Sequence, residues 1–174
     1  MSGVDAQRTP GSESGARRRE RNAWTADLLD LEAGRIGFPV LDREAIRTLL
    51  AARPRVAIVG ASPNPSRPSH GVLVDLVGLG FDVVPVNPTA DEVAGLRCYP
   101  SLPEAVAATG PVDIVDVFRL PPACPGHARE AVEVEASCLW LQLGIASREA
   151  GQIAHEAGLA IVMNRCLAVE AMRP

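Results

Sequence analysis

Short apolar runs alternate with segments of helical periodicity over most of the chain. Apolar runs typical of buried strands, with one shorter strand near the middle, cover residues 55–59, 82–86, 97–99, 113–118, 137–143 and 160–163. Between them, apolar positions recur at helical spacing over residues 69–79, 102–108, 123–134 and 147–157. This alternation predicts βαβ units in a parallel sheet. We therefore expect an α/β fold, a Rossmann-like doubly wound parallel sheet forming a single domain over residues 53–170.

The chain before this domain has a different pattern. Residues 1–22 are rich in Ser, Gly, Arg and Glu and hold almost no large apolar side chain, so we expect a disordered tail. Residues 23–52 are predicted to form a helical N-terminal extension. Asp42 is the expected cap of a helix over residues 43–52, which Pro54 ends.

Composition and charge narrow the classes of partner. Of 174 residues, 47% are apolar and only 3% aromatic, which predicts a core of aliphatic side chains. A formal charge of −4 argues against an extended nucleic-acid surface, and no apolar run approaches the roughly 20 residues that span a bilayer. The N-terminus lacks the apolar region of a secretory signal. The four cysteines form no CxxC pair and no metal-ligand spacing with the three histidines. We expect a cytoplasmic protein that binds no metal, nucleic acid or membrane.

The predicted topology places a ligand site before any motif is considered. In a doubly wound sheet of order 3-2-1-4-5-6, ligands bind where the strand order reverses, between the first and fourth strands. The loops at that position are residues 60–69 and 118–122. Gly60 follows the first strand directly and lets the backbone approach a ligand closely. The helix after the loop offers unpaired N–H groups and a positive dipole end, which favour an anion.

The first loop also carries polar groups suited to phosphate. Hydroxyl, amide and guanidinium donors and the backbone beside Gly60 give the candidate binding residues Ala61, Ser62, Asn64, Ser66, Arg67 and Ser69. Three prolines stiffen the loop and lower the entropy lost when a ligand orders it. The alternative is a simple strand-to-helix connection with a helix cap. The loop from Gly60 to Ser69 is longer than the roughly two to six residues usual for such connections, which favours ligand binding.

The loop departs from the dinucleotide fingerprint. The sequence Gly-Ala-Ser-Pro-Asn-Pro after the first strand has one glycine where G-x-G-x-x-G has three. The second strand ends at Asn87–Pro88, without the acidic residue that would bind a ribose diol. The usual marks of a nicotinamide cofactor are therefore missing.

At these positions the sequence resembles the small CoA-binding-domain family of bacterial proteins, which is similar to the N-terminal nucleotide-binding domain of the succinyl-CoA synthetase α subunit. The resemblance extends over about residues 42–170. The stretches that carry it, in chain order, are Val56–Ser69, Val84–Pro88, Gly95–Leu102, Val112–Arg119, Trp140–Gly144 and Val162–Cys166.

The resemblance implies a coenzyme A (CoA) site. The first loop would hold the phosphates, with the turns Asn87–Pro88 and Phe118–Arg119 flanking the nucleotide. Arg67 and Arg119 are the cations best placed for phosphate, although Arg119 could instead pair with a neighbouring surface carboxylate. The ends of the last two strands lie on the same rim and add the candidates Gln142, Gly144, Asn164 and Arg165. Cys166, beside Arg165, is either a structural thiol or one that exchanges with the CoA thiol.

No catalytic constellation accompanies this site. The chain shows no Ser/His/Asp order, no carboxylate pair and no second domain with a phosphorylated histidine such as a synthetase needs. We predict a non-catalytic CoA or acyl-CoA binding protein. Two alternatives stay open: a nicotinamide-nucleotide sensor, or a subunit of an acyl-CoA synthetase-type enzyme that acts with a separate chain. The expected partners are the CoA ligand and either a second copy of this chain or a synthetase-like protein.

Overall fold

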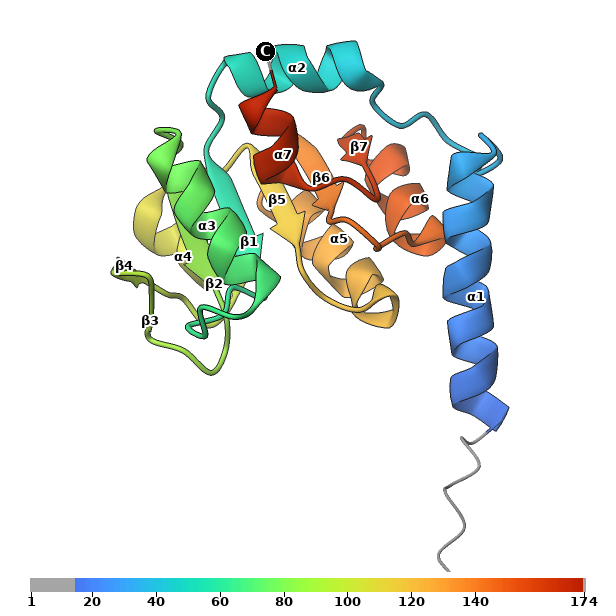
Figure 1. The fold of residues 1–174 in the computed structure, drawn as a ribbon, viewed down its shortest axis with the longest axis horizontal. Helices are drawn as coiled ribbons and strands as arrows, with labels where there is room; N and C mark the ends of the chain where they lie inside the picture. The colour runs from blue at the N-terminus through green and yellow to red at the C-terminus, as the bar shows by residue number, and fades with distance from the viewer. Residues whose placement is uncertain (1–14, 174) are drawn as a thin grey trace, which may run out of the picture.

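A five-stranded parallel sheet lies at the centre of the molecule in the computed structural model, which describes residues 15–173 (Figure 1). Its strands are β1 (Val56–Val59), β2 (Val83–Val86), β5 (Ile114–Val117), β6 (Cys138–Leu141) and β7 (Ala160–Val162). They lie in the order β2-β1-β5-β6-β7, so the chain crosses over between β1 and β5. The first four of these strands are buried along their whole length, as expected for a sheet covered on both faces. The predicted α/β fold is confirmed.

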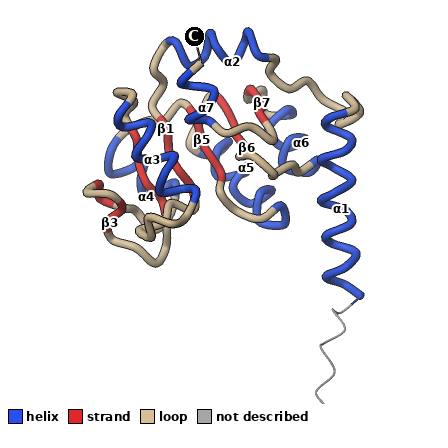
Figure 2. Tube along the Cα trace, in the orientation of Figure 1, coloured by secondary structure: helices blue, strands red, loops and turns tan. Residues whose placement is uncertain are grey.

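Helices cover both faces of the sheet (Figure 2). They are α3 (Pro68–Gly78), α4 (Leu102–Thr109), α5 (Cys124–Glu133, after a 3-10 turn over Pro121–Ala123), α6 (Arg148–Glu156) and α7 (Leu167–Met172). One apolar core lies between the sheet and α4, α5 and α6, whereas a second includes buried residues of α3 and α7. Helix α7 was not predicted. It packs against α3 and closes the second face behind the last strand.

The third sheet strand expected at residues 97–99 is not a regular strand. Instead, β3 (Glu92–Val93) and β4 (Leu96–Arg97) pair with each other as an antiparallel hairpin. Only Tyr99 joins the main sheet, through a single parallel bridge to Val86. The following residue is Pro100, which has no N–H to donate, so the ladder ends there.

The N-terminal extension contains two helices, α1 (Gly15–Glu32) and α2 (Arg43–Ala51). Asp42 caps α2 as predicted, because its Oδ1 accepts the Ala45 N–H at 2.9 Å. Residues 15–22 were expected to be disordered, but they form the first turns of α1; Ala, Arg and Glu in this stretch are strong helix formers. The rest of the expected tail lies outside the described residues. Helix α1 stands beside α6 at one side of the domain (Figure 1).

One arginine of α6 fixes α1 to the domain. The Arg148 guanidinium is 2.6 Å from Asp30 Oδ2 and also donates to the carbonyl of Ile36. The Arg148 backbone N–H donates to Asp27 Oδ2 at 2.8 Å. Both carboxylates belong to α1, so the N-terminus of α6 and the second half of α1 are joined by charge-assisted hydrogen bonds.

The linker between α1 and α2 is fixed by an aromatic ring. The Phe38 ring, 8% exposed, occupies the space above Gly151 in α6, where a Cβ would overlap the ring. Further along, the Leu41 N–H donates to Ile161 O at 2.8 Å, on the free edge of β7. The extension is therefore seated on the domain by packing and by backbone pairing.

Candidate functional site

The turn after β1 lies in contact with the turn after β5. Gly60 has φ +88°, a conformation that side chains rarely adopt. A Cβ at this position would lie 3.0 Å from Arg119 Cδ and 3.2 Å from Phe118 O. Only glycine lets these two turns meet at the crossover point, which is where the topology predicted the ligand site.

The first loop is held together by its own hydrogen bonds. Asn64 Oδ1 accepts from Ser66 N at 3.0 Å and from Ser66 Oγ at 2.7 Å. The His70 Nδ1–H donates to the carbonyl of Ser62 at 3.0 Å, which ties the loop back to α3. The side chains of Asn64 and Ser66 thus stabilise the shape of the loop. A loop ordered in advance loses less entropy on binding.

Asn87 joins the first loop to the turn after β2. Its Nδ2 donates to Ala61 O at 2.6 Å, and its Oδ1 accepts from Thr89 N at 2.9 Å. Both ends of the amide therefore have structural partners. Pro88, the next residue, is exposed and lies outside the cleft.

Helix α3 begins at the edge of the site without a side-chain cap. Its N-cap residue is Arg67, followed by Pro68 and the buried Ser69. Pro68 has no N–H, and the N–H groups of His70 and Gly71 donate to the Arg67 carbonyl at 3.0 and 3.4 Å. The Ser69 N–H and the positive dipole end of the helix remain available to an anion. Within residues 15–173, neither the Arg67 nor the Arg119 guanidinium has an ionic or hydrogen-bonding partner. No carboxylate pairs with Arg119 in this structure, in contrast to the surface ion pair considered as an alternative.

These elements enclose a cleft of about 570 Å³ at the carboxyl ends of β1, β5 and β6. The predicted residues that line it are Gly60, Ser62, Arg67, Ser69, Asn87, Phe118, Arg119 and Gln142. Pro68, Val72, Leu143 and Ile145 also line it and were not predicted. Cys166, which was considered as a reactive or structural thiol, lines it as well. Leu143 is 68% exposed. A large apolar side chain directly after a buried strand was the sequence signal that could have identified it.

The remaining predicted residues lie outside this cleft. Ala61 is fully buried, with its carbonyl bound to Asn87. Asn164 has φ +54°, and its Oδ1 accepts the Gly144 N–H at 2.8 Å, so these two residues hold the ends of β6 and β7 together. Arg165 pairs with Glu170 at 3.1 Å.

A buried polar pair lies beneath the cleft. Asp116 in β5 is fully buried, and Gln142 Nε2 donates to its two carboxyl oxygens at 2.9 and 2.8 Å. Burial raises the pKa of the Asp116 carboxyl well above its ordinary value, while the hydrogen bond from Gln142 opposes the shift. Gln142 is 3% exposed and lines the cleft, so Asp116 sets the orientation of an amide at the cleft wall.

The cysteines are all free thiols. Burial raises the pKa of Cys124 and of Cys138 to about 12, so both are protonated at neutral pH and are unreactive. Burial also raises the pKa of Cys98. Cys166 is the cysteine that reaches the cleft.

Over residues 15–173, no three or more His, Cys, Asp or Glu side chains are grouped so that they could hold a metal ion. Among the helices of residues 15–173, none is long and apolar enough to cross a bilayer.

Comparison with known proteins agrees with this geometry. A family model described as a CoA binding domain matches residues 54–172. The chain belongs to this CoA-binding domain family. The predicted resemblance is thereby confirmed, and the residues before 54 lie outside the matched range.

Several similar proteins match this chain over nearly their whole length. The uncharacterized protein YneT of Bacillus subtilis is 40% identical over 124 residues, which are 71% of this chain and 90% of YneT. A hypothetical protein from Pyrococcus horikoshii has a solved structure with 39% identity and a TM-score of 0.70, covering 75% of this chain and 89% of that one. A solved structure from Thermus thermophilus gives 37% identity, a TM-score of 0.69 and coverage of 75% and 96%.

Two larger enzymes also contain a segment that is similar to part of this chain. The ADP-forming acetate–CoA ligase II of Archaeoglobus fulgidus is 41% identical over 87 residues, and ligase I is 31% identical over 121 residues. These stretches are 48% and 64% of this chain but only 12% and 17% of the two ligases.

Proposed function

We propose that this protein binds CoA or an acyl-CoA in the cleft beside Gly60 and catalyses no reaction by itself. The observation that supports this proposal most directly is the pair of guanidinium groups, Arg67 and Arg119, that reach one cleft and have no partner among residues 15–173. CoA carries a diphosphate and a 3′-phosphate, and arginine is the side chain best suited to phosphate.

The residues of the cleft fit such a ligand. Arg67, Ser69 and the uncapped N-terminus of α3 would hold phosphate through charge and hydrogen bonds. Arg119 would bind a second phosphate from the opposite turn, with Phe118 beside the nucleotide. Gly60 lets the two turns that carry these groups come into contact, because a Cβ there would meet Arg119 Cδ and Phe118 O.

The absence of a general base from the cleft lining supports a binding role. Among its described lining residues there is no carboxylate and no histidine. His70 is engaged with the Ser62 carbonyl, and His127 lies 2.7 Å from Glu130 in α5. Proton transfer at a thioester would need a base within hydrogen-bond reach of the reacting atoms.

Native mass spectrometry of the purified full chain and calorimetry with CoA, ADP and NADH test the proposal. We expect CoA to bind more tightly than ADP, because the additional phosphate and the pantetheine arm add contacts. Binding of NADH without any response to CoA would favour the nicotinamide alternative. Equal affinity for CoA and ADP would contradict a site for the whole coenzyme.

The ligase relatives support a second candidate, a subunit that acts with a separate chain. ADP-forming acetate–CoA ligases contain a segment similar to this chain within a much longer protein. We would then expect affinity purification from cells to recover a synthetase-like protein in a fixed ratio, and the mixture, but not the isolated chain, to form acyl-CoA.

A further inference from the structure

A second cavity adjoins the cleft at the end nearer β7. It measures about 630 Å³ and is lined by the end of α1, the residues before α2, the segment after β7 and one side of α7. Leu143 and Cys166 line both cavities, so the two lie side by side. We call this second cavity the outer chamber. Its N-terminal wall consists of residues that lie before the range matched to the CoA-binding domain family.

The N-terminal wall of the outer chamber is a fixed part of the molecule. Phe38 and Leu41 hold the linker against α6 and β7, and Arg148 holds α1. Val40 and Arg43, which contribute to the wall, lie within two residues of Leu41. A wall anchored on both sides can supply groups to a ligand at low entropic cost.

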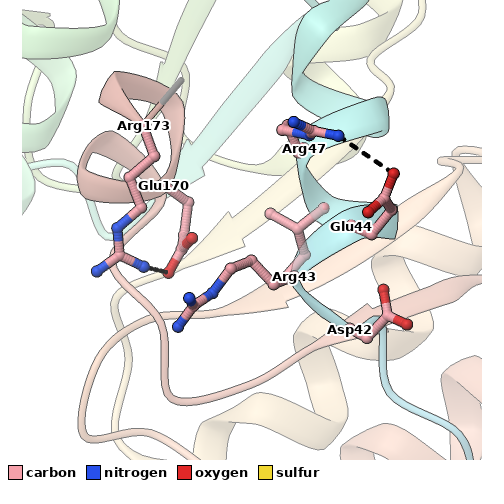
Figure 3. A pocket seen from close by; sticks show the side chains of 7 residues that line it. Asp42, Arg43, Glu44, Arg47, Glu170 and Arg173 are labelled. Atoms are coloured by element: carbon pink, nitrogen blue, oxygen red, sulfur yellow. Dashed lines mark hydrogen bonds and ion pairs between the residues drawn. The ribbon is translucent and has the colours of Figure 1, made fainter.

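The charged groups of the chamber leave one cation unpaired. Glu170, 8% exposed, pairs with both Arg165 at 3.1 Å and Arg173 at 2.7 Å. Arg43 has no ionic partner among the described residues. Figure 3 shows its side chain extending towards the Glu170–Arg173 pair, in a neighbouring pocket that shares these three residues.

The acidic residues around Arg43 do not neutralise it. Asp42 accepts the Ala45 N–H as the cap of α2, and Glu44 pairs with Arg47 at 3.1 Å. Glu32, at the end of α1, is exposed and makes no pair with Arg43. The Arg43 guanidinium therefore remains available to an anion that enters the chamber.

Aliphatic side chains form another part of the chamber lining, beside the polar Asn164. Val40, Leu143 and Val169 line it and are 37%, 68% and 45% exposed, respectively. Exposed aliphatic side chains around a concave surface are typical of a site for an apolar group. An occupant that matches both features has an aliphatic chain and a negative charge at its far end.

The distance across the sheet suits the arm of CoA. From β1 to β7 there are three strand spacings, which amount to about 14 Å. The pantetheine arm is comparable in length to about four extended residues, or roughly 14 Å. A ligand whose phosphates lie at the first loop can therefore carry its thiol end to the chamber.

We propose that the outer chamber receives the acyl group of a CoA thioester and that Arg43 pairs with a carboxylate at the far end of that group. The preferred ligand is then the CoA thioester of a dicarboxylic acid. This inference rests on the proposed CoA site and adds the substrate class.

Calorimetry with a matched pair of thioesters tests the inference on the full chain. Succinyl-CoA and butyryl-CoA have acyl groups of equal chain length and differ in the terminal carboxylate. We expect the native protein to bind succinyl-CoA about five- to tenfold more tightly than butyryl-CoA. Arg43→Ala should remove that preference and leave the affinities for CoA and butyryl-CoA unchanged, whereas Arg43→Lys should retain part of it.

Arg47→Ala is the matched control, since Arg47 lies one turn further along α2, pairs with Glu44 and does not line the chamber. It should keep the preference for succinyl-CoA. Equal affinity of the native protein for both thioesters would overturn the inference while leaving the CoA site intact. A loss of CoA affinity in Arg43→Ala would assign Arg43 to a phosphate and would also overturn it. If no CoA compound binds the native protein, the proposed function itself fails.

Discussion

The arginines along the rim of the sheet are used in two different ways. At the β1–β5 end, Arg67 and Arg119 reach the cleft without a partner. At the β7 end, Arg165 and Arg173 share the buried Glu170. All four side chains carry the same charge, yet the first pair is available to a ligand and the second stabilises α7. What separates them is the Glu170 carboxylate, which lies within five residues of Arg165 and Arg173 in the chain and which the fold buries.

Removing both free arginines is expected to have the largest effect. Arg67→Ala and Arg119→Ala should each weaken CoA binding by about 1–3 kcal/mol, and the double variant by more, because charge-assisted hydrogen bonds to phosphate are lost. Calorimetry measures the affinity, and thermal unfolding should show little change. Native affinity in both single variants would show that the phosphates lie elsewhere.

Gly60→Ala breaks the contact between the two turns that carry these arginines. The added Cβ meets Phe118 O and Arg119 Cδ, and φ +88° is strained for alanine, so we expect a loss of about 1–3 kcal/mol in the free energy of unfolding. CoA binding should fall as well, because Arg119 must move. Denaturant unfolding and calorimetry measure the two effects. Gly126→Ala, in α5 with open space around it, is the control.

Arg165→Ala tests the pair of arginines at the β7 end of the sheet. Glu170 keeps Arg173 but loses one charge-assisted partner, so we expect unfolding to become easier by about 1 kcal/mol. CoA affinity should stay within about twofold of the native value, since Arg165 lies outside the cleft. A variant of native stability that binds CoA poorly would reverse the assignment and make Arg165 a ligand contact.

Asp116→Asn removes the buried carboxyl group beneath the cleft and tests its raised pKa. Because burial raises the pKa of Asp116, the folded state binds its proton more tightly than the unfolded state. The native protein should therefore lose stability as the pH rises above the ordinary carboxyl pKa, until the raised pKa is reached. Asn carries no such proton, so the variant should gain stability relative to the native protein as the pH rises above the ordinary carboxyl pKa. Urea unfolding across that range measures the difference; an unchanged gap at every pH would contradict the raised pKa.

The fold and the position of the cleft could be predicted from the sequence, because both follow from patterns within short stretches of the chain. Apolar runs and helix starts identify the strands and α3, and the crossover rule then brings the loops after β1 and β5 together. Gly60, Arg67 and Arg119 were found in this way. Each lies directly after a strand or before a helix, where its place on the rim follows from its place in the chain.

The remaining site residues depend on contacts that no local pattern reveals. Asn87 and Asn164 look like ligand-binding amides in the sequence, but they bond to Ala61 and Gly144 in neighbouring loops. The Glu170 partner of Arg165 belongs to α7, a helix of six residues that gave no periodic signal. The outer chamber was missed because it forms only when the extension packs against α6 and β7.

The contact of Phe38 with Gly151 has a consequence that can be sought in the sequences of other family members. A helix that carries any larger residue at the position of Gly151 has no space for the ring, so an extension of this kind could not seat on it in the same way. A single glycine in α6 therefore acts as a marker in the sequence of a relative. Together with an aromatic residue shortly before the helix that precedes the first strand, it would predict which family members carry the chamber and which have only the cleft.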